Sequence, residues 1–402
     1  VKKVIVGQDH MVERLLVAVL ARGHILLEGL PGLAKTVAVS TMAEVIGGSF
    51  SRLQFTPDLL PSDLTGTRIW RGSDESFDIE WGPVFANFLL TDEINRAPAK
   101  VQSALLEVMA ERQVSIAGQT RPMPTPFLVL ATQNPVESEG VYTLPEAQRD
   151  RFLMKVVVGY PSPAEELEIV RRSGAAGVPQ GLAGIQNVMT TSRLVELQDL
   201  AQRVYVDTSV AQYAVDLVLA TREPELRGLP ELAPLIDFGV SPRATLGLID
   251  AAKGLALMRG RGYALPQDVF DVARDVLRHR LMLTYEALAE DRSADDILNR
   301  VLSVVPAADV TSARPEPAPA TVRPVVPGES LNAGSTDATA DLSSLIRRPA
   351  PAPAQPDAFG QPNPLQNDSP APSALDASVP PSEALSDSKP SPAATPSDHP
   401  AP

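Results

Sequence analysis

Short apolar runs alternate with segments of helical periodicity over roughly the first 160 residues of the chain. The apolar runs span residues 24–28, 53–55, 88–91, 127–132 and 154–158. Between them, residues 36–46 and 99–111 have the spacing of helices. Continuous apolar runs are typical of strands that are buried on both faces of a parallel sheet. The pattern therefore predicts an α/β domain over residues 1–160, with helices on both faces of the sheet.

The periodicity changes in the second part of the chain. Residues 161–305 are mostly helical in pattern and contain no comparable strand run, which predicts a small, all-helical second domain. Residues 306–402 differ again, because they hold 21 of the 39 prolines, many alanines and serines, and Phe359 as their one aromatic residue. A segment of this composition buries too little apolar surface to offset the entropy lost when its chain is ordered. We therefore expect residues 306–402 to form a disordered tail.

Composition narrows the classes of function. The chain has no cysteine and only four histidines, which excludes a disulfide scaffold and argues against a Cys/His metal site. The net charge of −14 argues against nucleic acid as the main partner. No apolar run approaches the ~20 residues that span a bilayer, and no signal peptide is recognisable, so we expect a cytoplasmic protein without a membrane span. The start at Val1 indicates either a fragment or a start codon other than ATG.

The strongest local signal is residues 29–36, Gly-Leu-Pro-Gly-Leu-Ala-Lys-Thr, which follow the first apolar run. They resemble the P-loop, G-x-x-x-x-G-K-[ST], although Ala34 replaces the last glycine. Lys35 would reach the β- and γ-phosphates, and the Thr36 hydroxyl would bind Mg²⁺. The alternative is a strand-to-helix turn with a chance lysine. The expected phosphate-binding residues are Gly29, Pro31, Gly32, Leu33, Ala34, Lys35 and Thr36.

A second signal is an apolar run that ends in two adjacent acids, Asp92 and Glu93. Phosphoryl transfer needs a carboxylate for the magnesium shell and a group that activates water. Asp92 suits the first role, and Glu93 suits the second as general base. An ordinary helix start with capping acids is the alternative, which the preceding buried-type strand disfavours.

Together these motifs resemble those of the AAA+ ATPases, and within them the MoxR family. The resemblance covers nearly all of residues 1–305, and it includes the stretches Gln-Phe-Thr-Pro-Asp-Leu-Leu-Pro-Ser-Asp at 54–63 and Thr-Asp-Glu-Ile-Asn-Arg-Ala-Pro at 91–98. The alanine before Lys35 matches the MoxR form of the P-loop. The resemblance implies an AAA+ P-loop core, a helical lid, and ATP and Mg²⁺ as cofactors.

Further site residues follow from the resemblance. Gly7 and Gln8 would contact the adenine through backbone groups. Asn134 resembles sensor 1 and would orient the attacking water, although an Asn-Pro pair alone reads as a turn. Arg151, in Asp-Arg-Phe, resembles the arginine finger that acts on a neighbouring subunit's ATP. Arg149 is the weaker candidate for that role, and a solvated basic face is the alternative for both.

The second domain carries one further candidate. The sequence Ser-Pro-Arg at 241–243 predicts a helix start, with Ser241 as the cap and Pro242 in the first turn. Arg243 then matches sensor 2, which would swing the lid onto the phosphates. The cluster Arg-His-Arg at 278–280 reads instead as a solvated helix end.

Two inserts interrupt the α/β pattern. Residues 53–88, with Trp70 and Trp81, form a stretch longer than a simple crossover and resemble the helix-2 insert. Residues 111–122 predict a β-hairpin with its turn at Ala-Gly-Gln. In related rings both elements usually face the central pore and contact a client, whereas the simpler interpretation is two surface hairpins.

The resemblance implies an ATPase that hydrolyses Mg-ATP as a ring, which we expect to be a hexamer, and that drives chaperone-like remodelling, maturation or metal insertion in client proteins. A von Willebrand factor A domain protein is the expected partner. One alternative is a magnesium-chelatase-like motor subunit, which shares the inserts. Another is an ATP-gated scaffold or regulator in which binding rather than turnover matters.

Overall fold

Five parallel strands form the central sheet of the described residues, in the order β2–β5–β8–β1–β9. The strands are β1 (Ile25–Glu28), β2 (Phe50–Gln54), β5 (Phe88–Asp92), β8 (Leu128–Gln133) and β9 (Met154–Val157). The computed structural model describes residues 1, 4–72, 76–135, 142, 144–174, 187–305 and 307. Each predicted apolar run is a strand of this sheet, which confirms the α/β core. The predicted tail lies outside the described residues except for Ala307.

Helices cover both faces of the sheet. Alternate residues of its strands face opposite sides, and apolar residues on both sides pack against helices. In β1, Ile25 and Leu27 pack with α1 (Asp9–Leu20) and α2 (Lys35–Ile46). Leu26, between them, packs on the opposite side with α4 (Ala99–Glu111). The sheet is therefore the middle of three layers, and its strands can be apolar throughout.

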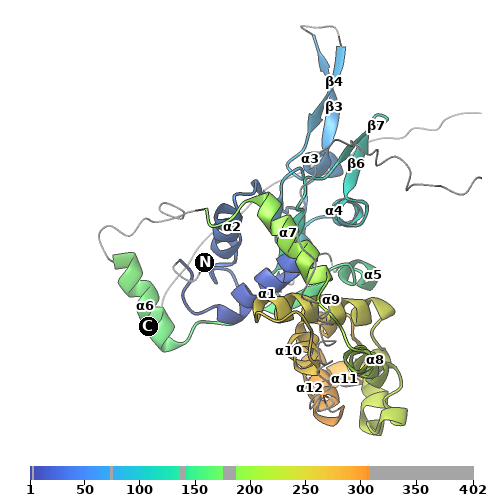
Figure 1. Ribbon diagram of the computed structural model, residues 1–402. Coiled ribbons are helices and arrows are strands. Elements are labelled where there is room, and N and C mark those ends of the chain that lie inside the picture. The colour runs from blue at the N-terminus through green and yellow to red at the C-terminus, as the bar shows by residue number, and fades with distance from the viewer. Residues whose placement is uncertain are drawn as a thin grey trace, which may run out of the picture. The chain divides into compact units, whose positions relative to one another are not determined.

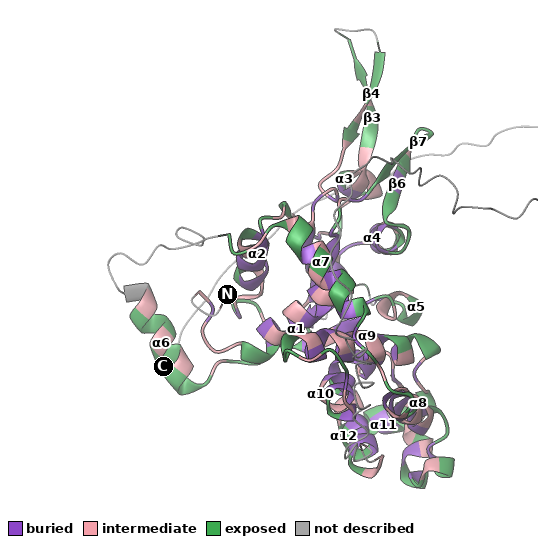
Figure 2. Ribbon diagram, in the orientation of Figure 1, coloured by how far each residue is buried: buried purple, intermediate pink, exposed green. Residues whose placement is uncertain are grey.

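Two hairpins project from the core (Figure 1). The first insert consists of α3 (Pro61–Thr65) and the antiparallel strands β3 (Gly66–Arg71) and β4 (Ser76–Trp81). The second is the predicted hairpin of β6 (Gln113–Ile116) and β7 (Gln119–Pro122), whose turn places Ala117 and Gly118 at positive φ. Figure 2 shows that β3 and β4 are mostly exposed, so neither strand buries a core face.

The rest of the described chain is mainly helical. Its helices are α5 (Glu146–Arg149), α6 (Pro163–Gly174), α7 (Thr191–Gln202), α8 (Thr208–Arg222), α9 (Pro242–Met258), α10 (Pro266–Leu277), α11 (Tyr285–Ala289) and α12 (Ala294–Val304). A short antiparallel pair, β10 (Ile236–Phe238) and β11 (Met282–Leu283), is added to the predicted helical lid. No helix among the described residues is long and apolar enough to cross a membrane. The predicted boundary at residue 160 stays a prediction.

Candidate nucleotide-binding site

The P-loop connects the carboxyl end of β1 to the start of α2, and three residues explain its shape. Gly32 and Ala34 both have positive φ, at +85° and +58°. Glycine is the usual residue in this left-handed region, which explains why the P-loop pattern has glycine at this position. In this chain Ala34 adopts the same backbone conformation. A Cβ on Gly29 would lie 2.7 Å from the Val158 carbonyl oxygen, so the chain after β9 leaves room for glycine alone.

Lys35 is the first residue of α2, and its Nζ donates a hydrogen bond to the Gly29 carbonyl at the loop's entrance. Burial lowers the pKa of this amine, and the nearby carboxylates of Asp92, Glu93 and Glu28 oppose that shift. The lysine is therefore close to the two predicted acids. Thr36, next in the first turn, is half-buried.

Thr132 joins the two acids through one hydroxyl group. Its Oγ1 donates to Asp92 Oδ1 at 3.1 Å and accepts from the Glu93 backbone N–H at 2.9 Å. The second oxygen of Asp92, Oδ2, accepts from Arg52 Nε at 2.7 Å. Asp92 is only 7% exposed, so each of its carboxylate oxygens has a partner in an otherwise buried position.

Glu93 directly follows β5 and has a left-handed backbone, with φ of 56° and ψ of 51°. Such a conformation is costly for a residue with a side chain and is found most often at functional sites. Its Oε2 accepts from Gln54 Nε2 at 2.7 Å and lies 3.2 Å from Arg96 Nη1. The carboxylate is thus held between the end of β2 and the turn that follows β5.

Asn134 completes the group at this edge of the sheet. It follows β8, which lies between β5 and β1, and it is 6% exposed. Its carbonyl accepts a hydrogen bond from Asn95 Nδ2 at 3.4 Å. The carboxyl ends of three neighbouring strands therefore bring the P-loop, the acids and this amide together, which is where parallel sheets bind ligands.

Gly7 and Gln8 lie beyond the other side of β1. Gln8 Nε2 donates to the Gly159 carbonyl at 3.0 Å, just after β9. Gly7 has φ of +72°, and a Cβ there would lie 2.5 Å from the Glu165 carboxyl carbon. These contacts fix the segment before α1 against the segment after β9, and its predicted contact with adenine stays a prediction.

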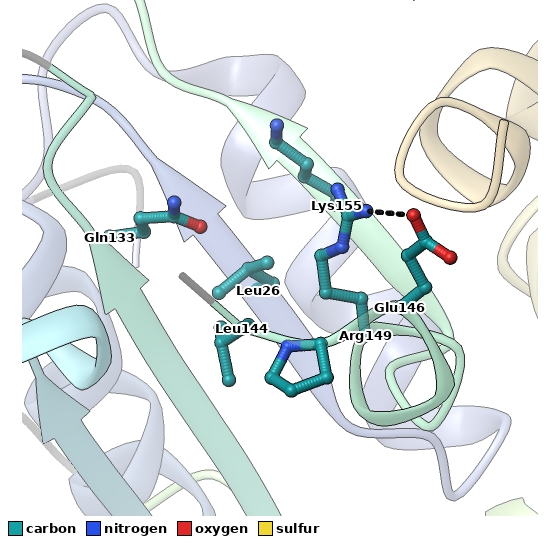
Figure 3. A pocket seen from close by; sticks show the side chains of 7 residues that line it. Leu26, Gln133, Leu144, Glu146, Arg149 and Lys155 are labelled. Carbon is teal, nitrogen blue, oxygen red and sulfur yellow. Dashed lines mark ion pairs between the residues drawn. The ribbon is translucent and has the colours of Figure 1, made fainter. Parts of the chain in front are cut away.

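The two finger candidates point to different places. Arg151 Nη1 donates to the Leu106 carbonyl of α4. Arg149 lines a cavity of about 540 Å³ and lies 3.8 Å from Glu146 Oε1 (Figure 3). The other lining residues are Leu26, Gln133, Leu144, Pro145, Glu146 and Lys155. Arg151 is therefore engaged with α4, whereas Arg149 lies at the wall of the cavity beside Glu146.

Arg243 lies at the start of α9, as predicted, with its side chain 62% exposed and Nη1 3.6 Å from Asp150 Oδ2. Ser241 occupies the predicted cap position without capping the helix. Its hydroxyl donates instead to Asp150, at 3.0–3.1 Å. The solvated helix end predicted at 278–280 is wrong, because the side chain of Arg280 is 4% exposed and His279 is 1% exposed.

Four residues that matter to this geometry lie outside the predicted site: Arg52, Gln54, Thr132 and Asp150. Arg52 and Gln54 are two residues apart in β2 and therefore lie on the same side of the strand. Arg52 contacts Asp92, and Gln54, which is in register with Asp92, contacts Glu93. A threonine inside the apolar run of β8 was the one local signal for Thr132, because a hydroxyl in a buried strand needs partners.

Comparison with known proteins agrees with this arrangement. Residues 24–154 match the ATPase family associated with various cellular activities (AAA), and residues 232–301 match the AAA lid domain. The fold and the site therefore define an AAA+ ATPase. A crystal structure of a putative ATPase from Cytophaga hutchinsonii superimposes with a TM-score of 0.71 at 48% identity, covering 76% of this chain and 91% of that one.

Sequence relatives narrow the class. The chain is 60% identical to Chaperone MoxR1 of Mycobacterium tuberculosis over 305 residues, which are 76% of this chain and 80% of that protein. It is 32% identical to Protein MoxR of Methylorubrum extorquens over 327 residues, with 76% and 93% covered. The chain belongs to the MoxR family of chaperone-like AAA+ ATPases, as its motifs predicted.

Proposed function

We propose that this ATPase binds and hydrolyses Mg-ATP at the carboxyl edge of its sheet. The observation that supports this most strongly is the convergence of Lys35, Asp92, Glu93 and Asn134 at the ends of three adjacent strands. Lys35 binds the β- and γ-phosphates together with the backbone of the P-loop. Glu93 takes a proton from the attacking water, which the Asn134 amide orients.

Mg²⁺ would be held by the Thr36 hydroxyl and the Asp92 carboxylate, and it would neutralise charge on the phosphates. Hydroxyl and carboxylate oxygens are ligands that suit this ion, and Thr36 and Asp92 both lie near Lys35, the proposed phosphate-binding residue. Among the described residues, no group of three or more His, Cys, Asp or Glu side chains could hold a metal ion. A site with few protein ligands fits magnesium, which keeps several waters and phosphate oxygens.

Three arginines have proposed roles around this centre. Arg243 binds the phosphates when the lid closes, and Arg151 acts on the ATP of a neighbouring subunit. Arg149 is the second candidate for the trans role, because it faces a cavity while Arg151 donates to Leu106. A site completed in trans requires a ring, which we propose to be hexameric.

The ring would use ATP turnover to remodel or mature client proteins, including by metal insertion, with a von Willebrand factor A domain protein as partner. The relative named Chaperone MoxR1 supports the chaperone-like role. The exposed hairpins β3–β4 and β6–β7 are the proposed client contacts inside the ring. The cytoplasmic location remains a prediction.

A lysine substitution tests the site assignment. Lys35→Ala should lower steady-state ATP hydrolysis at least about 100-fold, because the phosphates lose their cationic partner. Lys100→Ala, which changes an exposed lysine at the start of α4, is the matched control and should keep the wild-type rate. Normal hydrolysis by Lys35→Ala would remove the P-loop from the mechanism.

The scaffold alternative makes a different prediction. Glu93→Gln keeps the shape of the side chain and removes the base, so it should retain ATP without hydrolysing it. If turnover drives the function, cells that carry this variant should lose client maturation. If they keep it, binding is sufficient, and the scaffold function is correct.

A further inference from the structure

Asp150 lies at the meeting point of the core and the lid, between the two finger candidates Arg149 and Arg151. Its carboxylate accepts hydrogen bonds from Ser241 Oγ at 3.0–3.1 Å and from Arg280 Nε at 2.7 Å. Arg243 Nη1 approaches the same carboxylate to 3.6 Å. One side chain of the core thus contacts the start of α9 and the segment that follows α10 at once.

The contact through Arg280 is extensive and buried. Its guanidinium also donates to the backbone carbonyls of Asp150 at 3.2 Å, Phe152 at 2.6 Å and Leu153 at 3.1 Å. Burial lowers the pKa of Arg280, and the Asp150 carboxylate opposes that shift. His279 Nε2 lies 3.0 Å from the same Phe152 carbonyl oxygen. The segment 150–153 is therefore fixed to the residues that follow α10 by several hydrogen bonds.

The contact through α9 is of another kind. Ser241 is at the N-cap position, yet its hydroxyl donates to Asp150 rather than accepting from its own helix. Arg243 is 62% exposed, and its distance of 3.6 Å is longer than that of a charge-assisted hydrogen bond. Arg243 can therefore leave Asp150 while Ser241 and Arg280 keep the segment attached to the lid.

We propose that Asp150 is a positioning residue that acts across the subunit boundary. It fixes the segment that carries Arg149 and Arg151 to the lid of its own subunit. A lid movement then moves the arginine that the neighbouring subunit's ATP requires. This inference rests on the proposed function, since it assumes that one of the two arginines acts in trans. Stability alone explains this arrangement poorly, because a buried ion pair is often replaceable by apolar packing.

The inference predicts a specific defect in Asp150→Asn. The amide keeps the shape of the side chain but cannot pair with Arg280 as a carboxylate does. We expect kcat to fall about 10-fold or more, because a misplaced trans arginine loses much of its effect. Affinity for ATP should be measured separately for Glu93→Gln and for the double variant Asp150→Asn/Glu93→Gln, which do not turn the nucleotide over. The two affinities should differ by less than about 2-fold. Ser241→Ala should lower kcat in the same direction by a smaller factor.

Mixed rings separate positioning from a local folding defect. An Asp150→Asn subunit has an intact site of its own, and a Glu93→Gln subunit supplies a well-placed arginine. Their mixture should hydrolyse ATP faster than the two proteins measured separately. Absence of recovery with rings intact would overturn the inference, as would a wild-type kcat for Asp150→Asn.

A matched control is Asp216→Asn in α8, because Asp216 pairs with Arg227 at 2.7 Å within the lid and its side chain is 26% exposed. This variant should keep the wild-type kcat, and an equal loss in it would show that any broken lid ion pair suffices. The proposed function fails on a different result, namely no recovery in mixtures of Arg151→Ala or Arg149→Ala with Glu93→Gln. If the arginine variants recovered activity with Glu93→Gln but Asp150→Asn did not, the role of Asp150 would be overturned while the proposed function would stand.

Discussion

Thr132 is the residue on which both acids of the site depend. Its hydroxyl is the donor to Asp92 and the acceptor for the Glu93 backbone N–H, and it is 3% exposed. Water cannot replace these two bonds easily in such a buried place. One hydroxyl group therefore fixes one oxygen of the Asp92 carboxylate and the backbone of Glu93.

Substitution of this residue gives the first prediction. Thr132→Val keeps the volume and removes the hydroxyl, which leaves a buried donor and acceptor without partners at a cost of about 1–3 kcal/mol. We expect kcat for ATP hydrolysis to fall by roughly tenfold or more. Thr132→Ser, which retains the hydroxyl, should stay within a few-fold of wild type. Equal kinetics for the two variants would contradict this role.

His24 shows how burial makes the fold sensitive to acid. It precedes β1, is 6% exposed, and its Nδ1 accepts from the Val129 backbone N–H at 2.9 Å. Burial, together with the positive charge of Arg112, lowers the pKa of His24 to about 4. The ring is therefore neutral in the fold, whereas in the unfolded chain it gains a proton near its ordinary pKa of about 6.5.

The second prediction follows from that difference in pKa. The unfolded chain binds more protons between pH 6.5 and 4, so the free energy of unfolding falls as pH falls through this window, by about 3 kcal/mol for His24. His24→Asn retains an acceptor for Val129 without the titration. Urea unfolding at pH 7 and pH 4.5 should show a smaller loss in the variant. The same pH dependence in both proteins would contradict the assignment.

At the scale of elements, the β3–β4 hairpin depends on the glycine at its base. Gly66 has φ of +104°, and a Cβ there would lie 2.2 Å from the Glu80 carbonyl oxygen in the paired strand. Both tryptophans of the chain, Trp70 and Trp81, belong to this hairpin. Trp70 is exposed on the hairpin, whereas Trp81 packs against the core at the end of β4, so tryptophan fluorescence reports on the hairpin and on its attachment to the core.

Gly66→Ala should destabilise the hairpin by about 1–3 kcal/mol, because a side chain is strained at this φ and collides with β4. The tryptophan transition in urea should move to lower concentration than in wild type, while far-UV circular dichroism of the remaining fold changes little. Gly72→Ala is the control, since a Cβ there meets no atom within 4 Å. If both substitutions had the same effect, the steric argument would be wrong.

The elements that the sequence predicts well are those with a strong local pattern. The five strands and the helix at Ala99–Glu111 follow from continuous apolar runs and helical spacing. The β10–β11 pair was not predicted, because β10 has only three residues and β11 only two. Ile236 of β10 pairs with Leu283 of β11. Such short strands are defined by a distant partner, and no periodicity over two or three residues can reveal them.

The same distinction holds for the site. Lys35, Asp92 and Glu93 belong to contiguous motifs and were found by their spacing. Gln54 and Thr132 could not be assigned, because their roles depend on the strand register, which pairs Gln54 with Asp92 and aligns β8 between β5 and β1. The family relationship supplies the order of motifs, while the contacts between them require the structure.

For the described molecule as a whole, buried charges join the core to the lid. Arg14 in α1 donates to Asp275 in α10 at 2.7 Å, with side chains that are 5% and 2% exposed. Arg280 makes a second connection through Asp150. The local pattern predicts a solvated Arg280, because a basic cluster at a helix end is usually solvated and its half-buried partner, Asp150, lies 130 residues away. These two arginines are thus among the charged residues that join the nucleotide core to the lid.

A mixture of two inactive subunits tests most directly the central claim that ATP is hydrolysed at sites completed between subunits. Arg151→Ala retains Glu93 but lacks the proposed trans arginine, and Glu93→Gln retains that arginine but lacks the proposed base. Each protein alone should hydrolyse ATP at least about 100-fold more slowly than wild type. Mixed in equal amounts, they should recover a readily measured fraction of wild-type activity. If neither Arg151→Ala nor Arg149→Ala recovered activity at any ratio with Glu93→Gln, while the rings stayed intact, the claim that sites are completed between subunits would be contradicted.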